Sequence, residues 1–126
     1  MTTSHDAGQL HIDHTLWNKE LNFYADELAV FENRLSDLVQ KDRNAEMLAK
    51  LEHFQNQFIR QKEVLDELSH EIGLHEQKMA RLLKNNQSLT DDLRAHHDQV
   101  AERMGDYRRI YSDLKTEFQR YLVKWI

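Results

Sequence analysis

The sequence contains no cysteine and no proline, and only three glycines among its 126 residues. Without cysteine, the chain cannot form disulfides, present a thiolate nucleophile, or hold an iron–sulfur cluster or a cysteine-ligated zinc ion. The lack of proline, together with an abundance of Glu, Lys, Leu, Gln, Asp and Arg, is typical of long helices rather than of sheets. We therefore expect an all-α fold, in which any metal ion would be bound by histidine, carboxylate or water.

Long apolar runs and one-sided charge are also missing. No apolar run approaches the roughly 20 residues that a membrane span requires, and the N-terminal residues lack the cationic start and apolar stretch of a signal peptide. Acidic and basic residues are interspersed, with a net charge of -5, so the chain offers no basic face to a phosphate backbone. We expect a cytoplasmic protein that binds neither membranes nor nucleic acid.

Three long segments carry apolar residues at alternating steps of four and three, which is the pattern of a heptad seam. Polar clusters at residues 41–44 and 84–87 separate the segments, and each cluster contains or precedes residues suited to cap a helix: Asp42 or Asn44, and a capping box that starts at Ser88. The pattern predicts helices over about residues 10–40, 44–84 and 88–125.

The two connections between these helices are short, so consecutive helices should be antiparallel neighbours in one domain covering residues 1–126. The predicted architecture is an up-down-up three-helix bundle with coiled-coil-like seams. Each turn acts as a mirror point, which fixes the facing positions to within about one helical turn. This register places Phe31, Phe54 and Phe118 in one layer. It places the amide of Gln61 beside Tyr24 and Tyr111, whose hydroxyls are expected to satisfy it.

The same register brings three seam histidines, His14, His75 and His97, to one end of the bundle. Imidazole together with carboxylate suits Zn, Fe, Ni or Cu without strong preference among them. Further ligands, or partners that hold the histidine rings, are available from four nearby residues: His11, Glu71, Glu76 and His96. No other cofactor is expected.

A structural role is the first interpretation of the histidine layer, and metal binding is the alternative. Seam histidines bonded to neighbouring glutamates can end a coiled-coil core or set its register, and they can act as a pH-responsive packing switch. The pair Glu67 and His70 matches the spacing of a di-iron motif, but both residues point away from the seam, so we interpret the match as coincidence.

Two apolar surfaces point to a protein partner. On the first helix, Leu16, Phe23 and Val30 recur every seven residues beside the seam. At the end of the bundle where the second and third helices are connected, these two helices extend beyond the expected start of the first helix. We expect five apolar residues there to be covered by a second subunit or another protein, or else to form a simple two-helix tip: Met79, Leu82, Leu83, Leu89 and Leu93.

Residues 53–62 and 65–68, together with the segment from Ile110 to Trp125, resemble small, uncharacterised bacterial helical-bundle proteins. The resemblance implies a helical fold and carries no activity, cofactor or partner. No catalytic signature is present, so a non-enzymatic protein is expected. The first hypothesis is a scaffold or adaptor that acts through protein association, as a homodimer or with another protein. The alternative is a transition-metal-binding bundle, and a metal-dependent redox enzyme would require that alternative to hold first.

Overall fold

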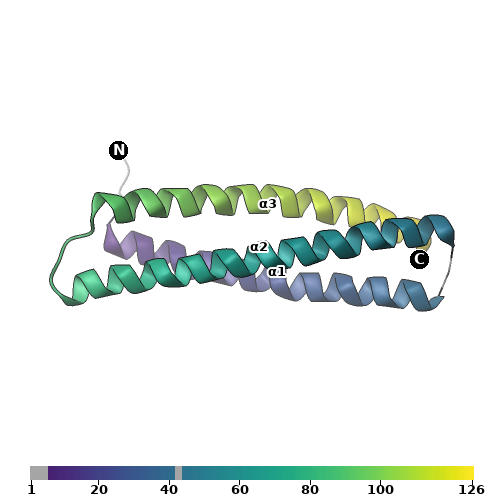
Figure 1. The fold of residues 1–126 in the computed structure, drawn as a ribbon, viewed down its shortest axis with the longest axis horizontal. Helices are drawn as coiled ribbons and strands as arrows, with labels where there is room; N and C mark the ends of the chain where they lie inside the picture. Colours follow the sequence, from purple (N-terminus) through teal and green to yellow (C-terminus); the bar gives the residue numbers. More distant parts are fainter. Residues whose placement is uncertain (1–5, 42–43) are drawn as a thin grey trace.

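The computed structural model describes residues 6–41 and 44–126, which form three long helices running alternately up, down and up (Figure 1). Helix α1 spans Ala7–Lys41, α2 spans Ala45–Lys84 and α3 spans Asp91–Trp125. Their buried residues are the positions of the three predicted seams. The predicted all-α, antiparallel three-helix bundle is therefore confirmed. None of the three helices combines the length and apolarity needed to cross a membrane, within the residues described.

The predicted register is confirmed by an aromatic layer in the half of the bundle near the α1–α2 connection. The ring of Phe118 lies 5.0 Å from that of Phe31 and 5.3 Å from that of Phe54, measured between centroids. Phe118 is completely buried, and Phe58 packs against it from α2. Aromatic side chains buried in this way supply much of the hydrophobic stabilisation of a small core.

Asn44, one of the two caps predicted from the sequence, directly precedes the first residue of α2 and caps this helix. The side chain of Asn44 accepts hydrogen bonds from the backbone N–H groups of Glu46 and Met47, at 2.9 and 3.2 Å. These bonds satisfy two of the donors that a helix start leaves unpaired. Asp42, the other proposed cap, lies outside the described residues.

The predicted starts of α1 and α3 are each wrong by three residues. α1 begins at Ala7, where Asp6 accepts a hydrogen bond from the backbone N–H of Gln9 at 2.7 Å. α3 begins at Asp91, because Thr90 rather than Ser88 is the cap and accepts from the N–H of Leu93 at 3.1 Å. The side chain of Leu89 is buried in the core. Its burial requires the chain to stay extended up to Thr90.

Thr90→Ala is expected to destabilise the protein by about 1 kcal/mol, because it removes the oxygen that caps α3. Ser88→Ala is the matched control, since Ser88 is exposed and does not cap the helix; its effect should stay within about 0.5 kcal/mol. Urea unfolding followed by circular dichroism measures both changes. Equal losses in the two variants would contradict the assignment of Thr90 as the cap.

The turn between α2 and α3 closes the end of the bundle at which α1 begins (Figure 1). Asn86 adopts a left-handed conformation with φ of 58°. The N–H groups of Gln87 and Asn86 bond back to the carbonyls of Leu82 and Leu83, at 2.8 and 3.1 Å. This pair of bonds is a Schellman motif, which ends α2 sharply and turns the chain toward α3.

The apolar tip is not the uncovered surface that the sequence predicted. Because α1 starts at Ala7, Leu10 reaches the tip and packs with Met79, Leu89 and Leu93, all of which are buried within the single chain. Leu82 is half-buried, and only Leu83 remains exposed. The premise that this end needs a second subunit to cover it is therefore wrong.

The predicted satisfaction of Gln61 is also wrong. Its Oε1 atom is buried without a hydrogen-bond partner among the described residues. Tyr24 instead donates to Glu20 at 2.7 Å, and Tyr111 donates to Glu27 at 2.5 Å. Ionised carboxylates are stronger acceptors than an amide oxygen, so the tyrosine hydroxyls turn outward to them.

Candidate metal centre

The three seam histidines meet in one layer inside the core. His14 of α1, His75 of α2 and His97 of α3 are 2 %, 1 % and 2 % exposed. The layer lies between the tip cluster, formed by Leu10, Met79, Leu89 and Leu93, and the main core, which begins at Trp17, Ile72 and Val100. The core therefore continues on both sides of the histidines and does not end at them.

The three imidazole rings contact one another directly. Ring centroids are separated by 4.9 Å between His14 and His75, 5.1 Å between His14 and His97, and 5.5 Å between His75 and His97. One ring nitrogen from each histidine lies within 4.8 Å of the other two. The indole of Trp17 stacks on His97 with a centroid distance of 4.8 Å and closes the layer toward the main core. The predicted convergence of the three histidines is confirmed.

Each histidine also has a partner on its outer side. The Nδ1 atom of His14 is hydrogen-bonded to Glu76, and the second oxygen of that carboxylate bonds to Nδ1 of His11 at 3.0 Å. The Nε2 atom of His97 lies 2.8 Å from Oδ2 of Asp13. The other oxygen of Asp13 accepts from the side chain of Gln9 at 3.0 Å, which holds the carboxylate in place.

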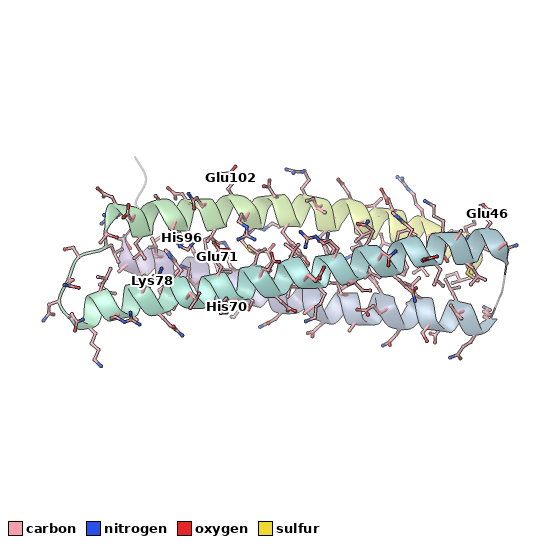
Figure 2. All side chains as sticks on the ribbon, in the orientation of Figure 1. Glu46, His70, Glu71, Lys78, His96 and Glu102 are labelled. Atoms are coloured by element: carbon pink, nitrogen blue, oxygen red, sulfur yellow. The ribbon has the colours of Figure 1, made fainter. Side chains whose placement is uncertain are left out.

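The outer partner of His75 is another histidine. Its Nδ1 atom lies 3.1 Å from Nδ1 of His96, and Nε2 of His96 lies 2.9 Å from Glu71. Arg103 donates a hydrogen bond to the other oxygen of Glu71. Figure 2 shows His96 and Glu71 next to each other in the space between α2 and α3. A chain of contacts thus runs from the buried ring of His75 to the bundle surface.

These outer bonds determine which ring nitrogens carry protons. An ionised carboxylate only accepts hydrogen bonds, so Nδ1 of His14 and Nε2 of His97 must each be the protonated nitrogen. In the neutral rings, the two inner nitrogens, Nε2 of His14 and Nδ1 of His97, are then bare acceptors, and they face each other at 3.2 Å. Two lone pairs at this distance repel each other unless a cation lies between them.

The third histidine follows the same logic. His96 donates from Nε2 to Glu71, so its neutral ring accepts at Nδ1, and His75 must donate to it from its own Nδ1. The Nε2 atom of His75 is then also a bare acceptor, and it is buried without a hydrogen-bond partner among the described residues. A buried nitrogen without a partner lowers stability, so three bare nitrogens in one buried layer call for a ligand.

The pKa values of His75 and His14 favour the neutral form that metal binding requires. Burial, with additional repulsion from His14, His96 and His97, lowers the pKa of His75 from 6.5 to about 4. Burial also lowers the pKa of His14, although the hydrogen bond to Glu76 acts in the opposite direction. Burial acts to raise the pKa of Glu76, but hydrogen bonds to His14 and His11 outweigh it and keep that pKa below its usual range. The carboxylate is therefore ionised at neutral pH.

The arrangement is close to that of a tri-histidine metal site. Two nitrogens bound to one tetrahedral zinc ion lie about 3.3 Å apart, and the inner nitrogens of His14 and His97 are 3.2 Å apart. The largest separation within the trio, at most 4.8 Å, would shorten by about 1.5 Å on binding. Metal-ligating histidines generally donate their other nitrogen to a carboxylate or another acceptor. All three seam histidines do so here.

Two of the other predicted site residues, Glu76 and His96, are hydrogen-bonded to histidines of the trio. The other two lie one bond further out: His11 is bonded to Glu76, and Glu71 to His96. Sequence reasoning placed Asp13 among the carboxylates near the histidines without assigning it to His97, and it missed Trp17 and Arg103. Arg103 follows His96 by seven residues and so faces α2 from the same side of α3, which was the available signal for it. His53 and His70 are exposed and away from the site, and His5 lies outside the described residues.

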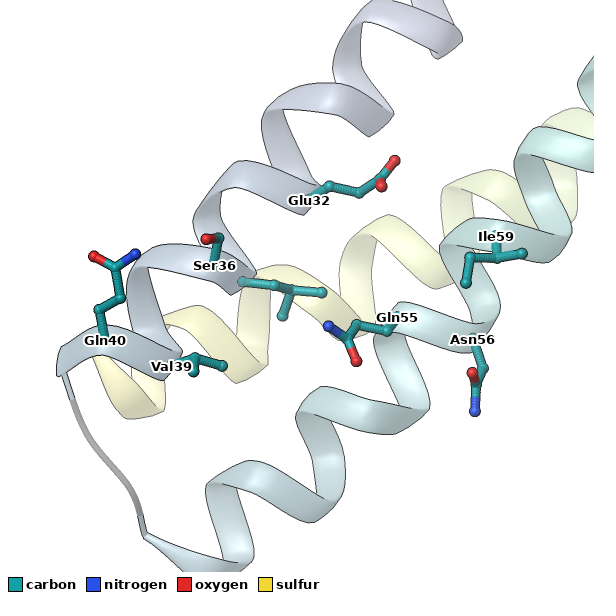
Figure 3. A pocket seen from close by; sticks show the side chains of 8 residues that line it. Glu32, Ser36, Val39, Gln40, Gln55, Asn56 and Ile59 are labelled. Atoms are coloured by element: carbon teal, nitrogen blue, oxygen red, sulfur yellow. The ribbon is translucent and has the colours of Figure 1, made fainter.

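A groove between α1 and α2, with a volume of about 480 Å³, lies on the half of the bundle far from the histidines (Figure 3). It is lined by Glu32, Leu35, Ser36, Val39, Gln40, Gln55, Asn56 and Ile59. Glu32 is the only ionisable group in this lining, so the groove offers little for acid–base chemistry or metal binding. The histidine layer is thus the better candidate site.

No family profile, no curated protein and no solved structure matches this chain.

Proposed function

We propose that this protein binds one divalent transition-metal ion per chain through His14, His75 and His97. The observation that carries the proposal is the set of outer hydrogen bonds. They fix all three rings so that a bare nitrogen of each remains unused by the protein itself. The function is one of binding, and it assigns no catalytic step to the chain.

The charge around the layer suits a divalent ion. Three neutral imidazoles bring no charge, whereas Glu76 and Asp13 bring two carboxylates in direct contact with them. A third carboxylate, that of Glu71, is already balanced by Arg103. Two negative charges in contact with a buried site favour an ion of charge +2.

The donor set also limits which metals fit. Imidazole nitrogen suits Zn, Cu, Fe and Ni, whereas Mg²⁺ and Ca²⁺ prefer oxygen ligands. Within the described residues, the group of donors that lie close together comprises three histidines, which leaves the fourth position of a tetrahedral ion to water or another small ligand.

Isothermal titration calorimetry with Zn²⁺, on protein carrying no histidine tag, tests the proposal. We expect one ion bound per chain, and we expect His97→Ala to abolish this binding. His53→Ala is the matched control, because His53 is exposed and lies outside the layer. Absence of binding to the wild-type protein, or equal binding by the His97→Ala variant, would refute the proposal.

Glu76→Gln is expected to weaken metal affinity by about 10- to 100-fold without abolishing it. The amide is neutral, and it no longer fixes the tautomer of His14 as an ionised carboxylate does. Competition with a chromophoric chelator measures the change. Glu102→Gln is the control, because Glu102 is an exposed glutamate of α3 on the outer side of the bundle (Figure 2). An unchanged metal affinity in Glu76→Gln would show that the hydrogen bond between Glu76 and His14 does not contribute to metal binding.

A second proposed function is protein association, as a scaffold or adaptor. It is supported by the apolar row on α1, where Leu16, Phe23 and Val30 are all more than half exposed. Large apolar side chains that recur on one exposed helix face mark interaction surfaces. The molecular mass in solution, measured over a wide concentration range, tests whether the protein associates with itself.

A further inference from the structure

We infer that the partner on the α1 row is a second copy of this chain, bound with the two α1 helices antiparallel and with Phe23 at the two-fold axis. This inference rests on the proposed association function. It is independent of metal binding, because the row lies on the outer face of α1 and the histidines face inward.

The row stays uncovered within the single chain. Leu16, Phe23 and Val30 are 57 %, 56 % and 51 % exposed. Their neighbours in the seam are buried or, beside Phe23, half-buried. The three residues recur at intervals of seven, so they lie along one line on the helix, about 21 Å long. A straight apolar line on a helix fits the matching line of another helix.

The row is self-complementary when two copies run antiparallel. Leu16 precedes Phe23 by seven residues and Val30 follows it by seven. An antiparallel pair centred on Phe23 therefore places Leu16 of each chain against Val30 of the other, while the two Phe23 rings meet at the axis. Such a contact closes on itself as a dimer and does not propagate into a filament.

Charges beside the row favour the same orientation. Lys19 and Asp26 are exposed and lie on one edge of the row, four residues before and three residues after Phe23. The antiparallel arrangement brings Lys19 of each chain level with Asp26 of the other, so two ion pairs form across the axis. In a parallel arrangement, this edge of one chain lies across the interface from the same edge of the other chain, so Lys19 and Asp26 do not meet.

The other edge of the row is already neutralised within the chain. Glu20 is paired with Arg108, with one contact of 2.9 Å, and Glu27 is paired with Lys115 at 2.9 Å. Two copies can therefore approach along this edge without strong repulsion between the glutamates. The contact involves one helix face per chain and falls at the small end of specific interfaces, so the dimer should be weak and reversible.

Sedimentation equilibrium of the whole chain, with and without Zn²⁺, tests the inference. We expect a concentration-dependent monomer–dimer equilibrium, which Phe23→Glu should shift at least tenfold toward the monomer. Lys19→Asp should weaken the dimer, and the charge exchange Lys19→Asp with Asp26→Lys should restore it. All three residues are exposed, so circular dichroism should show unchanged folding of each variant.

The absence of native cysteine allows a direct test of orientation. Phe23→Cys should form a disulfide with its own copy, and a mixture of Leu16→Cys and Val30→Cys should give the mixed disulfide in preference to either homodimer. A strict monomer would overturn the inferred dimer, but not an association with another protein. A dimer insensitive to Phe23→Glu would overturn only the α1 face, and preferential homodimers of Leu16→Cys would overturn the antiparallel arrangement.

Discussion

Saturating Zn²⁺ is expected to raise the melting temperature of the metal-free protein by roughly 10 °C. An ion that binds only the folded chain stabilises it by about 3 kcal/mol at a hundredfold excess over its dissociation constant, and in a chain of this size that free energy corresponds to a shift of this order. The gain arises because the bare nitrogens of His14, His75 and His97, which repel one another in the metal-free protein, all gain a shared partner. Differential scanning calorimetry of chelator-treated protein, with and without added zinc, measures it.

His75→Leu is the informative variant for this melt. It should show no response to zinc, while its metal-free form should be as stable as the metal-free wild type or more stable, because leucine fills a similar volume without an unpaired buried nitrogen. His70→Leu, five residues earlier but exposed, should keep the full zinc response. A zinc-induced shift of equal size in His75→Leu would mean that the ion stabilises the protein from another site.

The second large effect is a loss of folding stability at low pH. The metal-free protein is expected to lose roughly 3 kcal/mol of stability between about pH 6.5 and pH 4 through His75 alone, since burial lowers its pKa from 6.5 to about 4. The direction follows from proton binding. Between these pH values the unfolded chain has a protonated His75 and the folded chain does not, so falling pH favours unfolding. The lowered pKa of His14 acts in the same direction.

Urea unfolding of chelator-treated protein at a series of pH values measures this loss. In His75→Leu the slope of the free energy of unfolding against pH should become shallower over the same interval, because one titrating group has been removed. Added zinc should preserve stability to lower pH in the wild type, since protons must displace the ion before they reach the inner nitrogens. A free energy of unfolding that does not depend on pH in this interval would contradict the burial of neutral histidines.

Much of the fold could be predicted because each helix carries an uninterrupted seam. With two short connections, consecutive helices must pack antiparallel, and the resulting register placed Phe118 against Phe31 and Phe54. The handedness of the bundle does not follow from the seams. The same register predicted that His14, His75 and His97 meet, although they are separated by up to 83 positions in the chain. Heptad position carries this information because it fixes both the face and the height of a side chain.

The helix starts and the polar partners were less predictable, because both depend on local competition. Ser88 and Thr90 are both good caps, and the burial of Leu89 between them decides in favour of Thr90. The tyrosines near Gln61 donate to carboxylates that flank the seam. A prediction made from seam positions alone does not include these carboxylates.

A crystal structure of the zinc-loaded protein, with an anomalous difference map recorded at the zinc edge, tests the central claim most directly. We predict one strong anomalous peak per chain, bonded to nitrogen atoms of His14, His75 and His97 at about 2.0–2.1 Å, with Glu76 and Asp13 still bonded to the outer nitrogens. A peak elsewhere on the chain, or an unchanged histidine layer with no peak at saturating zinc, would contradict it.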